Sequence, residues 1–352
     1  MGEKQKSKRK QDIVFLNILF CMLVIFIHIS SEIILKMDRG RTMFWTVFAL
    51  SRLSGFVVQG FILLSGVKLF FKAGSMRYGR FYLSRLVSVL LPYIAWVFLY
   101  YLYFCWKGYY IFSWAELGRF LLFGDLSAHF YFIVILVQFY LLAPVWMFLF
   151  RRANPAVALV IALMINILSG TCLGEVIQLL VPGADISHLD ILFPRYLFYW
   201  TAGCMIGLHY QEFQNYLKSH WLSITLLFLG CAVFNAWLSV VFINNSPYWL
   251  EQVHMLYCIS AILFFYMLAQ LFTDGGGVLL KPFQGIDRAS YSIYLVHCLV
   301  IFMTNSYMDN HGIGDLTLRY GLRALTAYFG SILLCVIWQF CKGGIANLIR
   351  KT

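Results

Sequence analysis

The residue best placed to do chemistry is His28, which lies inside the first membrane-length apolar run, FLNILFCMLVIFIHIS. An ionisable side chain at that depth costs a few kcal/mol, so it commonly faces a polar cavity and has a function. Asn17 precedes His28 by close to three helical turns, about 16 Å along the axis on the same face. Glu32 follows one turn later. This spacing predicts an imidazole base that a carboxylate orients. In the alternative, Glu32 is an interfacial residue that points at water.

Four more polar residues are predicted inside or at the ends of spans. Arg52 and Arg195 lie near the outer boundary, where a long side chain can reach the interface. Several arginines around one cavity would instead bind an anion. His129 and His297 are single helical histidines, which are more often structural than catalytic. The sequence leaves both readings open for each of the four.

Basic residues also gather where the third apolar run begins, at Arg80 and Arg85 in RFYLSRLVSVLLPYIAW. The excess of Lys and Arg in cytoplasmic segments explains them without any function. A phosphate-rich cytoplasmic donor would require the same charges, and composition does not separate these explanations.

The composition defines an integral membrane protein. Hydrophobic residues make up 61% of the chain and charged residues only 12%, against about a quarter charged in soluble domains. The net charge of +12 comes from short basic segments between apolar runs, which is a topology signal and predicts contact with anionic lipids rather than nucleic acid. The nine cysteines show no metal-binding or disulfide spacing, so we expect no metal.

Spans of about 20 apolar residues predict an all-α membrane protein with ten transmembrane helices and both termini in the cytoplasm. Residues 1–11 and 342–352 are expected to form basic tails, and 12–341 a single membrane domain without internal repeats. The ten expected spans are 12–35, 45–70, 82–105, 128–150, 156–180, 191–209, 220–241, 250–273, 289–308 and 318–341.

Six stretches in order resemble the membrane-bound acyltransferase 3 family, whose multi-pass bacterial members O-acylate surface or secreted sugars. They are FLNILFCMLVIFIH, SRLSGFVVQGFILLSG, FYLSRLVSVLLPYIAW, HFYFIVILVQFYLLAPV, YLFYWTAGCMIG and SYSIYLVH. The resemblance makes His28 the catalytic residue and places Arg85 and Ser88 on a pair of family arginines linked to the acyl donor. Asn17 and Gln59 stand where the family usually has an arginine and a proline.

The resemblance implies a bacterial plasma-membrane enzyme that moves an acyl group, expected to be acetyl, from cytoplasmic acyl-CoA to a saccharide hydroxyl. We predict that His28 acts as base or acyl relay and that Glu32 orients it. The residues predicted to bind the donor are Arg80, Arg85 and Ser88. Those predicted to bind the acceptor are Asn17, Arg52, His129, Arg195 and His297. The alternatives are a glycan exporter and a non-catalytic scaffold of a polysaccharide machine, and a homo-oligomer is left open.

Overall fold

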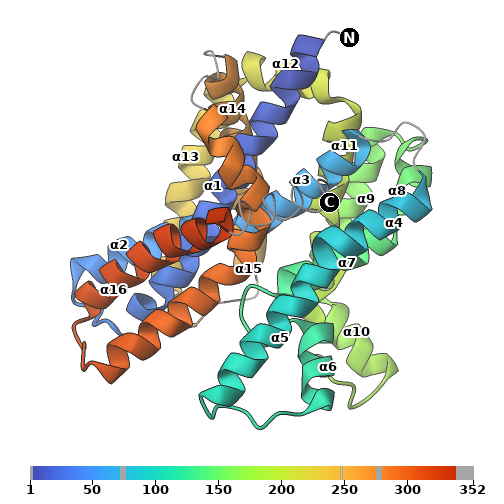
Figure 1. Ribbon diagram of the computed structural model, residues 1–352. Helices are drawn as coiled ribbons and strands as arrows, with labels where there is room; N and C mark the ends of the chain where they lie inside the picture. The colour runs from blue at the N-terminus through green and yellow to red at the C-terminus, as the bar shows by residue number, and fades with distance from the viewer. Residues whose placement is uncertain (1–2, 72–76, 246, 248, 275–279, 338–352) are drawn as a thin grey trace, which may run out of the picture. The chain divides into compact units, whose positions relative to one another are not determined.

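The computed structural model describes residues 3–71, 77–245, 247, 249–274 and 280–337, and every regular element among them is helical (Figure 1). Long apolar segments favour this outcome, because a helix satisfies its backbone hydrogen bonds within one segment where no water is available. The described helices pack into two compact units.

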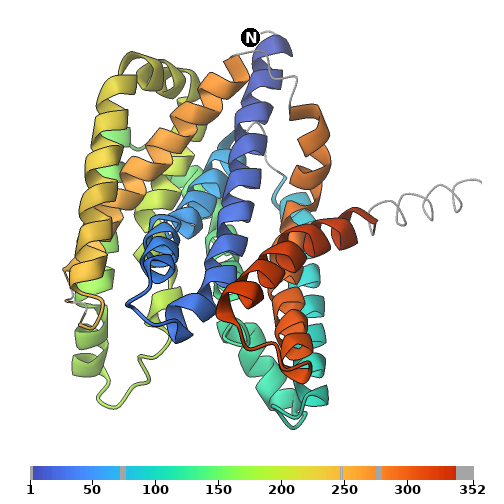
Figure 2. The same cartoon turned by 90° about the vertical axis from the view of Figure 1, so that its left-hand side faces the viewer.

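Unit 1 contains the described residues of 1–57, 221–245 and 257–352. Its central element is α1, which packs against α15, α2 and α16; Figure 2 shows α1 as the long blue helix crossed near its lower end by α16. The helices of unit 1 are α1 (Glu3–Lys36), α2 (Thr42–Leu53), α13 (Trp221–Val241), α14 (Leu250–Asp274, from Tyr257 onward), α15 (Leu280–Asn310), α16 (Leu316–Leu325) and the π-helical turn η4 (Thr326–Gly330).

A buried apolar cluster fixes the C-terminal end of α1 in unit 1. Ile33 and Met37 of α1 pack against Phe44, Val47 and Phe48 of α2, and partly buried side chains of α16 complete the cluster. The rings of Phe44 and Phe48 stack with their centroids 5.9 Å apart. This packing holds the turns of α1 that follow His28 against α2 and α16.

Unit 2 contains the described residues of 58–220 and 246–256. Its elements are α3 (Val57–Phe71, from residue 58), α4 (Tyr78–Arg85), η1 (Leu86–Leu90), α5 (Leu91–Trp106), α6 (Trp114–Phe123), α7 (Tyr131–Leu141), α8 (Ala143–Phe150), α9 (Pro155–Thr171), α10 (Leu173–Leu180), η2 (Leu189–Ile191), η3 (Phe193–Tyr196), α11 (Leu197–Leu208) and α12 (Tyr210–Ser219).

Two glycines let α3 and α11 approach closely within unit 2. A Cβ atom on Gly203 would lie 2.1 Å from the carbonyl oxygen of Leu63, and one on Gly66 would lie 2.7 Å from that of Trp200. Small residues at such crossings allow backbone-to-backbone packing, which is how helices commonly associate in membranes.

The described residues hold seven helices long and apolar enough to cross a membrane, or up to nine if each of two bent pairs is one span. The expected spans 128–150 and 156–180 are these bent pairs, with angles of 59° between α7 and α8 and 64° between α9 and α10. Pro144 lies in the first turn of α8 and explains the first bend, since proline cannot continue the hydrogen-bond ladder.

The expected sixth span, 191–209, is shorter than predicted. It consists of the 3-10 turns η2 and η3 followed by α11, which has only 12 residues. The count of ten spans is therefore not confirmed. The cytoplasmic placement of both termini stays a prediction, and residues 338–352, with the C-terminal tail, lie outside the described part of the chain.

Candidate active site in unit 1

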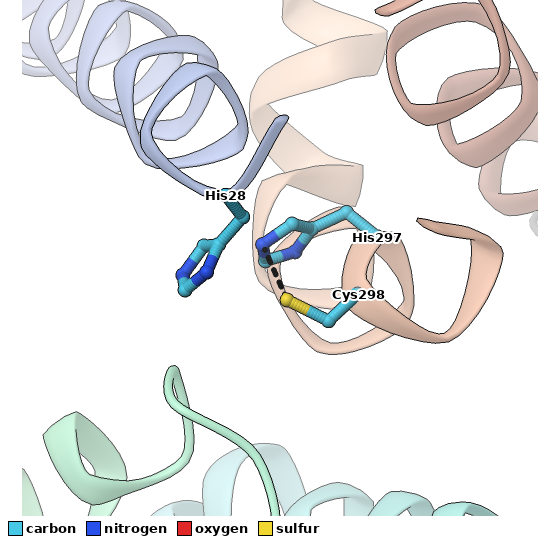
Figure 3. A group of neighbouring side chains, drawn as sticks. All are labelled: His28, His297 and Cys298. Atoms are coloured by element: carbon cyan, nitrogen blue, oxygen red, sulfur yellow. Dashed lines mark hydrogen bonds between the residues drawn. The ribbon is translucent and has the colours of Figure 1, made fainter. Parts of the chain in front are cut away.

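His28 of α1 lies beside His297 of α15, a residue 269 positions further along the chain (Figure 3). The centroids of the two imidazole rings are 5.1 Å apart, and their planes are inclined by 51°. His28 is partly buried and His297 is fully buried. Packing of α15 along α1 therefore brings together two histidines that the sequence presented separately.

The hydrogen bonds of His297 define which ring nitrogen carries the proton. Nδ1 lies 2.7 Å from the carbonyl oxygen of Tyr294, one turn earlier on α15. A carbonyl oxygen only accepts, so Nδ1 is the donor, and the Nε2 atom of the neutral ring is an acceptor. Nε2 lies 3.3 Å from Sγ of Cys298, whose side chain is buried (Figure 3).

The three side chains His28, His297 and Cys298 form a compact group of nitrogen and sulfur atoms. One ring nitrogen of His28, one ring nitrogen of His297 and the Cys298 sulfur all lie within 4.8 Å of one another. Imidazole nitrogen and thiolate sulfur are the ligands that Zn²⁺ takes in proteins, so this group could hold a soft metal ion. The same arrangement also suits nucleophilic chemistry, because a thiol lies within reach of a histidine base.

Glu32 anchors a buried ion network between α1 and α16. Its Oε1 accepts from Nε of Arg319 at 3.0 Å, and its Oε2 accepts from Nη1 of Arg323 at 3.0 Å. Lys36 also donates to Oε1 at 2.9 Å, and Arg319 contacts Asp309 of α15 at 2.7 Å. Glu32, Arg319 and Arg323 are all buried, at 6%, 5% and 2% exposure. Two carboxylates thus balance two buried guanidiniums.

This network connects with His28 through the backbone. Nη2 of Arg323 donates to the carbonyl oxygen of His28 at 2.7 Å and to the Ser31 hydroxyl at 3.0 Å. Each carboxylate oxygen of Glu32 accepts a hydrogen bond from an arginine. Glu32 is therefore connected to the backbone of His28 through Arg323, which contacts both residues. The side chain of Glu32 is buried, so it does not point at water as the alternative prediction had it. Its catalytic importance stays a prediction.

Asn17 and Arg52 also belong to unit 1, and both have polar partners there. Nδ2 of Asn17 donates to Oδ1 of Asp287 on α15 at 3.0 Å. Nε of Arg52 donates to the Ser239 hydroxyl of α13 at 3.3 Å. These bonds tie neighbouring helices together, which accounts for both residues without a substrate.

The three residues predicted to bind the donor lie in unit 2. Arg80 and Ser88 are exposed, on α4 and on the π-helical segment η1. Arg85 is partly buried, with its guanidinium carbon 4.5 Å from the ring centroid of Tyr140 and 5.2 Å from that of Phe81. Its Nε atom is buried and has no hydrogen-bond partner among the described residues. The aromatic rings hold the guanidinium in place by cation–π contact.

His129 also lies in unit 2 and is nearly fully buried, at 2% exposure. Its Nδ1 is 3.1 Å from the Ser127 hydroxyl, and its ring packs on Phe130 with the centroids 4.1 Å apart. These contacts fit the structural reading of this histidine.

Arg195 pairs with Glu251 at 2.8 Å and borders an open cavity of about 520 Å³ where α9 bends into α10. Gly170 lies next to this ion pair: a Cβ atom on Gly170 would be 3.6 Å from a carboxylate oxygen of Glu251. Hydroxyl, amide and carboxylate side chains line the cavity, namely Ser169, Thr171, Glu175, Gln178 and Asp190.

Sequence reasoning missed Cys298, Arg319 and Arg323. The arginines had a local signal, because their spacing of four places both on one face of an otherwise apolar segment. Cys298 follows His297 directly, but nothing near it in the sequence indicates that His28 lies beside the pair.

The apolar spans and the buried polar residues together define a multi-pass helical membrane protein. A family model described as an acyltransferase domain matches residues 13–339. The chain therefore belongs to the acyltransferase 3 family, which confirms the resemblance read from the six sequence stretches.

Two curated staphylococcal relatives share a name that describes a probable polysaccharide export protein. The chain is 21% identical over 359 residues to the "Probable poly-beta-1,6-N-acetyl-D-glucosamine export protein" of Staphylococcus epidermidis, covering 98% of this chain and 93% of the relative. The protein of the same name from Staphylococcus aureus strain Mu50 is 22% identical over 323 residues, covering 86% and 87%. No solved structure matches the chain.

Proposed function

We propose that the protein is a transmembrane O-acyltransferase of the bacterial plasma membrane. It transfers an acyl group, acetyl in our proposal, from cytoplasmic acyl-CoA to a hydroxyl of a cell-envelope or exported saccharide. Membership of the acyltransferase 3 family supports the reaction class. The names of the curated relatives support a polysaccharide as the acceptor.

The observation that carries the proposal is the placement of His28. A sugar hydroxyl is a weak nucleophile at neutral pH and needs a general base within about 3 Å. His28 is an imidazole within a membrane-length helix, and Arg323 ties its backbone to α16. A base held in this way removes the hydroxyl proton as the oxygen attacks the acyl carbonyl.

On the donor side, the proposal assigns Arg85 to the phosphates of acyl-CoA, with Arg80 and Ser88 beside it on the same continuous helical segment. Guanidinium groups bind phosphate through charge-assisted hydrogen bonds. The Nε atom of Arg85 supports this assignment, because it is a donor that has no acceptor among the described residues.

On the acceptor side, the open cavity beside Arg195 supports saccharide binding. A cavity of about 520 Å³ falls in the range of small-molecule sites, and its hydroxyl, amide and carboxylate groups suit sugar hydroxyls. Arg195 pairs with Glu251 and borders this cavity. The residues that do not line it are ranked below Arg195 as acceptor contacts, namely Asn17, Arg52, His129 and His297.

A second candidate function is glycan export. The curated relatives are named export proteins, and two helix pairs in unit 2 are bent by 59° and 64°. Interrupted helices are a feature of transporter binding sites. Deleting the gene separates the two functions: surface glycan that is present but unacylated supports the enzyme, whereas its absence from the surface supports the exporter.

The direct test of the enzyme is acetyl transfer in membranes supplied with acetyl-CoA labelled in the acetyl group. His28→Gln is expected to lower label in the surface glycan by at least about 100-fold, the lower range for a positioned acid–base group. His311→Gln is the control, since that exposed histidine follows the last residue of α15 and contacts the carbonyl oxygen of Tyr307. Equal labelling by wild type and His28→Gln would overturn the assignment of His28.

A further inference from the structure

We propose that Cys298 is the nucleophile of a two-step transfer and carries the acyl group as a thioester between donor and acceptor. This inference rests on the proposed acyltransferase function and adds a residue and an intermediate to it. Its basis is the group of His28, His297 and Cys298 at the contact of α1 and α15 (Figure 3).

The pair Cys298 and His297 has the geometry of an activated nucleophile. Sγ lies 3.3 Å from Nε2, within hydrogen-bonding reach for sulfur, and the Nδ1 bond to Tyr294 leaves Nε2 as the acceptor. A nucleophile, its base and a third group that orients the base are the signature of covalent catalysis. Here a backbone carbonyl of the same helix is the orienting group, so α15 builds the arrangement within two turns.

In the first step the Cys298 thiol gives its proton to Nε2 of His297, and the sulfur attacks the carbonyl carbon of acyl-CoA. A carbon–sulfur bond forms to Cys298 while the bond to the CoA sulfur breaks. The proton then passes from His297 to the departing CoA thiolate. One thioester replaces another, so the step needs no further energy source.

In the second step the acceptor hydroxyl attacks the acyl carbon on Cys298. His28 takes the hydroxyl proton, the carbon–oxygen bond of the ester forms, and the bond to Cys298 breaks. The proton returns to the sulfur, which restores the free enzyme. A ring nitrogen of His28 lies within 4.8 Å of Sγ, so an oxygen in hydrogen-bond contact with His28 is also close to a carbonyl carbon held on that sulfur.

The geometry gives the two histidines separate roles. The nitrogen of His297 that faces the thiol serves the first step, whereas His28 is the more exposed of the two and serves the incoming acceptor. This division explains why two imidazole rings lie with their centroids 5.1 Å apart in a protein whose proposed reaction has two steps, each of which needs a base.

The test traps the intermediate on the purified full-length protein, incubated without acceptor with acetyl-CoA labelled in the acetyl group. We expect label on the wild-type protein that neutral hydroxylamine releases, with the acetylated peptide containing Cys298. The Cys298→Ala variant should carry no label there and should lose at least about 100-fold in transfer to glycan. Cys298→Ser should carry an oxygen ester that resists neutral hydroxylamine.

Two variants separate a catalytic from a structural role. Cys21→Ser is the matched control, because that thiol is equally buried, on α1, and donates to the carbonyl oxygen of Ser290. It should label and transfer like wild type. His28→Gln should form the thioester yet fail to pass it on, so label should accumulate on Cys298 even when acceptor is present.

Three results would overturn the relay. In the first, Cys298→Ala transfers the acyl group to glycan within threefold of the wild-type rate; in the second, a wild-type protein that acylates glycan carries no label on Cys298. In the third, the purified protein contains stoichiometric zinc, and Cys298→Ala loses it. The first two leave the acyltransferase proposal intact, because glycan is still acylated. A wild-type protein that neither labels nor acylates glycan would instead refute the proposed function itself.

Discussion

Removing the charge of Glu32 is the sharpest test of how unit 1 holds its active site. The Glu32→Gln variant leaves the guanidiniums of Arg319 and Arg323 without the carboxylate that they share. Both guanidiniums are buried, so water cannot replace the lost partner. The Glu32→Gln substitution therefore removes one buried negative charge and changes the size of the side chain very little.

The structure sets the expected magnitude. Removing one partner of a buried ion pair costs about 3–5 kcal/mol. Arg319 keeps its contact with Asp309 at 2.7 Å, and Arg323 keeps the His28 carbonyl at 2.7 Å, which favours the low end of that range. We expect Glu32→Gln to lower the free energy of unfolding by about 3 kcal/mol. Adding Arg323→Gln restores the charge balance, so the two changes should couple by about 2 kcal/mol.

The assay is reversible unfolding in mixed detergent micelles of wild type, both single variants and the double variant. Glu212→Gln is the control, because the Glu212 side chain is 80% exposed and pairs only with His209 among the ion pairs found in the described chain. That variant should change stability by less than about 0.5 kcal/mol. Single-variant effects that add to within about 0.5 kcal/mol would refute the coupled network.

Acetyl transfer by the same variants distinguishes a positioning role of Glu32 from a direct one. If Glu32 acts by holding Arg323 against the His28 turn, Glu32→Gln and Arg323→Gln should lower transfer by similar factors, about 10-fold each. A carboxylate that acted directly on the imidazole would make Glu32→Gln far more damaging than Arg323→Gln, and that outcome would contradict the positioning role.

Two further predictions concern unit 2. Arg85→Ala should raise KM for acetyl-CoA about 10-fold, because one charged contact to a phosphate is lost. The guanidinium of Arg152 is exposed and stacks on Phe148, so Arg152→Ala should leave this KM unchanged. An unchanged KM of Arg85→Ala in steady-state kinetics would refute the donor assignment. Gly203→Ala should lower the free energy of unfolding by about 3 kcal/mol or more, because its Cβ would overlap the backbone of α3. A Cβ on Gly230 of α13 would meet no atom of the described residues within 4 Å, so Gly230→Ala should shift this free energy by no more than about 1 kcal/mol. Equal melting curves for the two glycine variants would contradict the close packing.

The sequence by itself determined the class of protein and the residue to examine first. Apolar runs of membrane length need helices, because lipid offers no partner to a backbone amide, and every regular element among the described residues is helical. His28 was identified because an imidazole in such a run is costly. Pro144 is also a local signal for the bend between α7 and α8, although the apolar pattern predicts 128–150 as one span.

Tertiary structure alone decided what surrounds His28. His297 and Cys298 are 269 and 270 positions away, and the partners of Glu32 on α16 are almost 300 away. Helical periodicity relates residues within one segment. It therefore predicts that Glu32 lies one turn after His28 on the same face, but it cannot predict the arginines that donate to the Glu32 carboxylate. Only the packing of α15 and α16 against α1 sets those distances, because the helix neighbours are chosen by side-chain fit along whole faces rather than by local sequence.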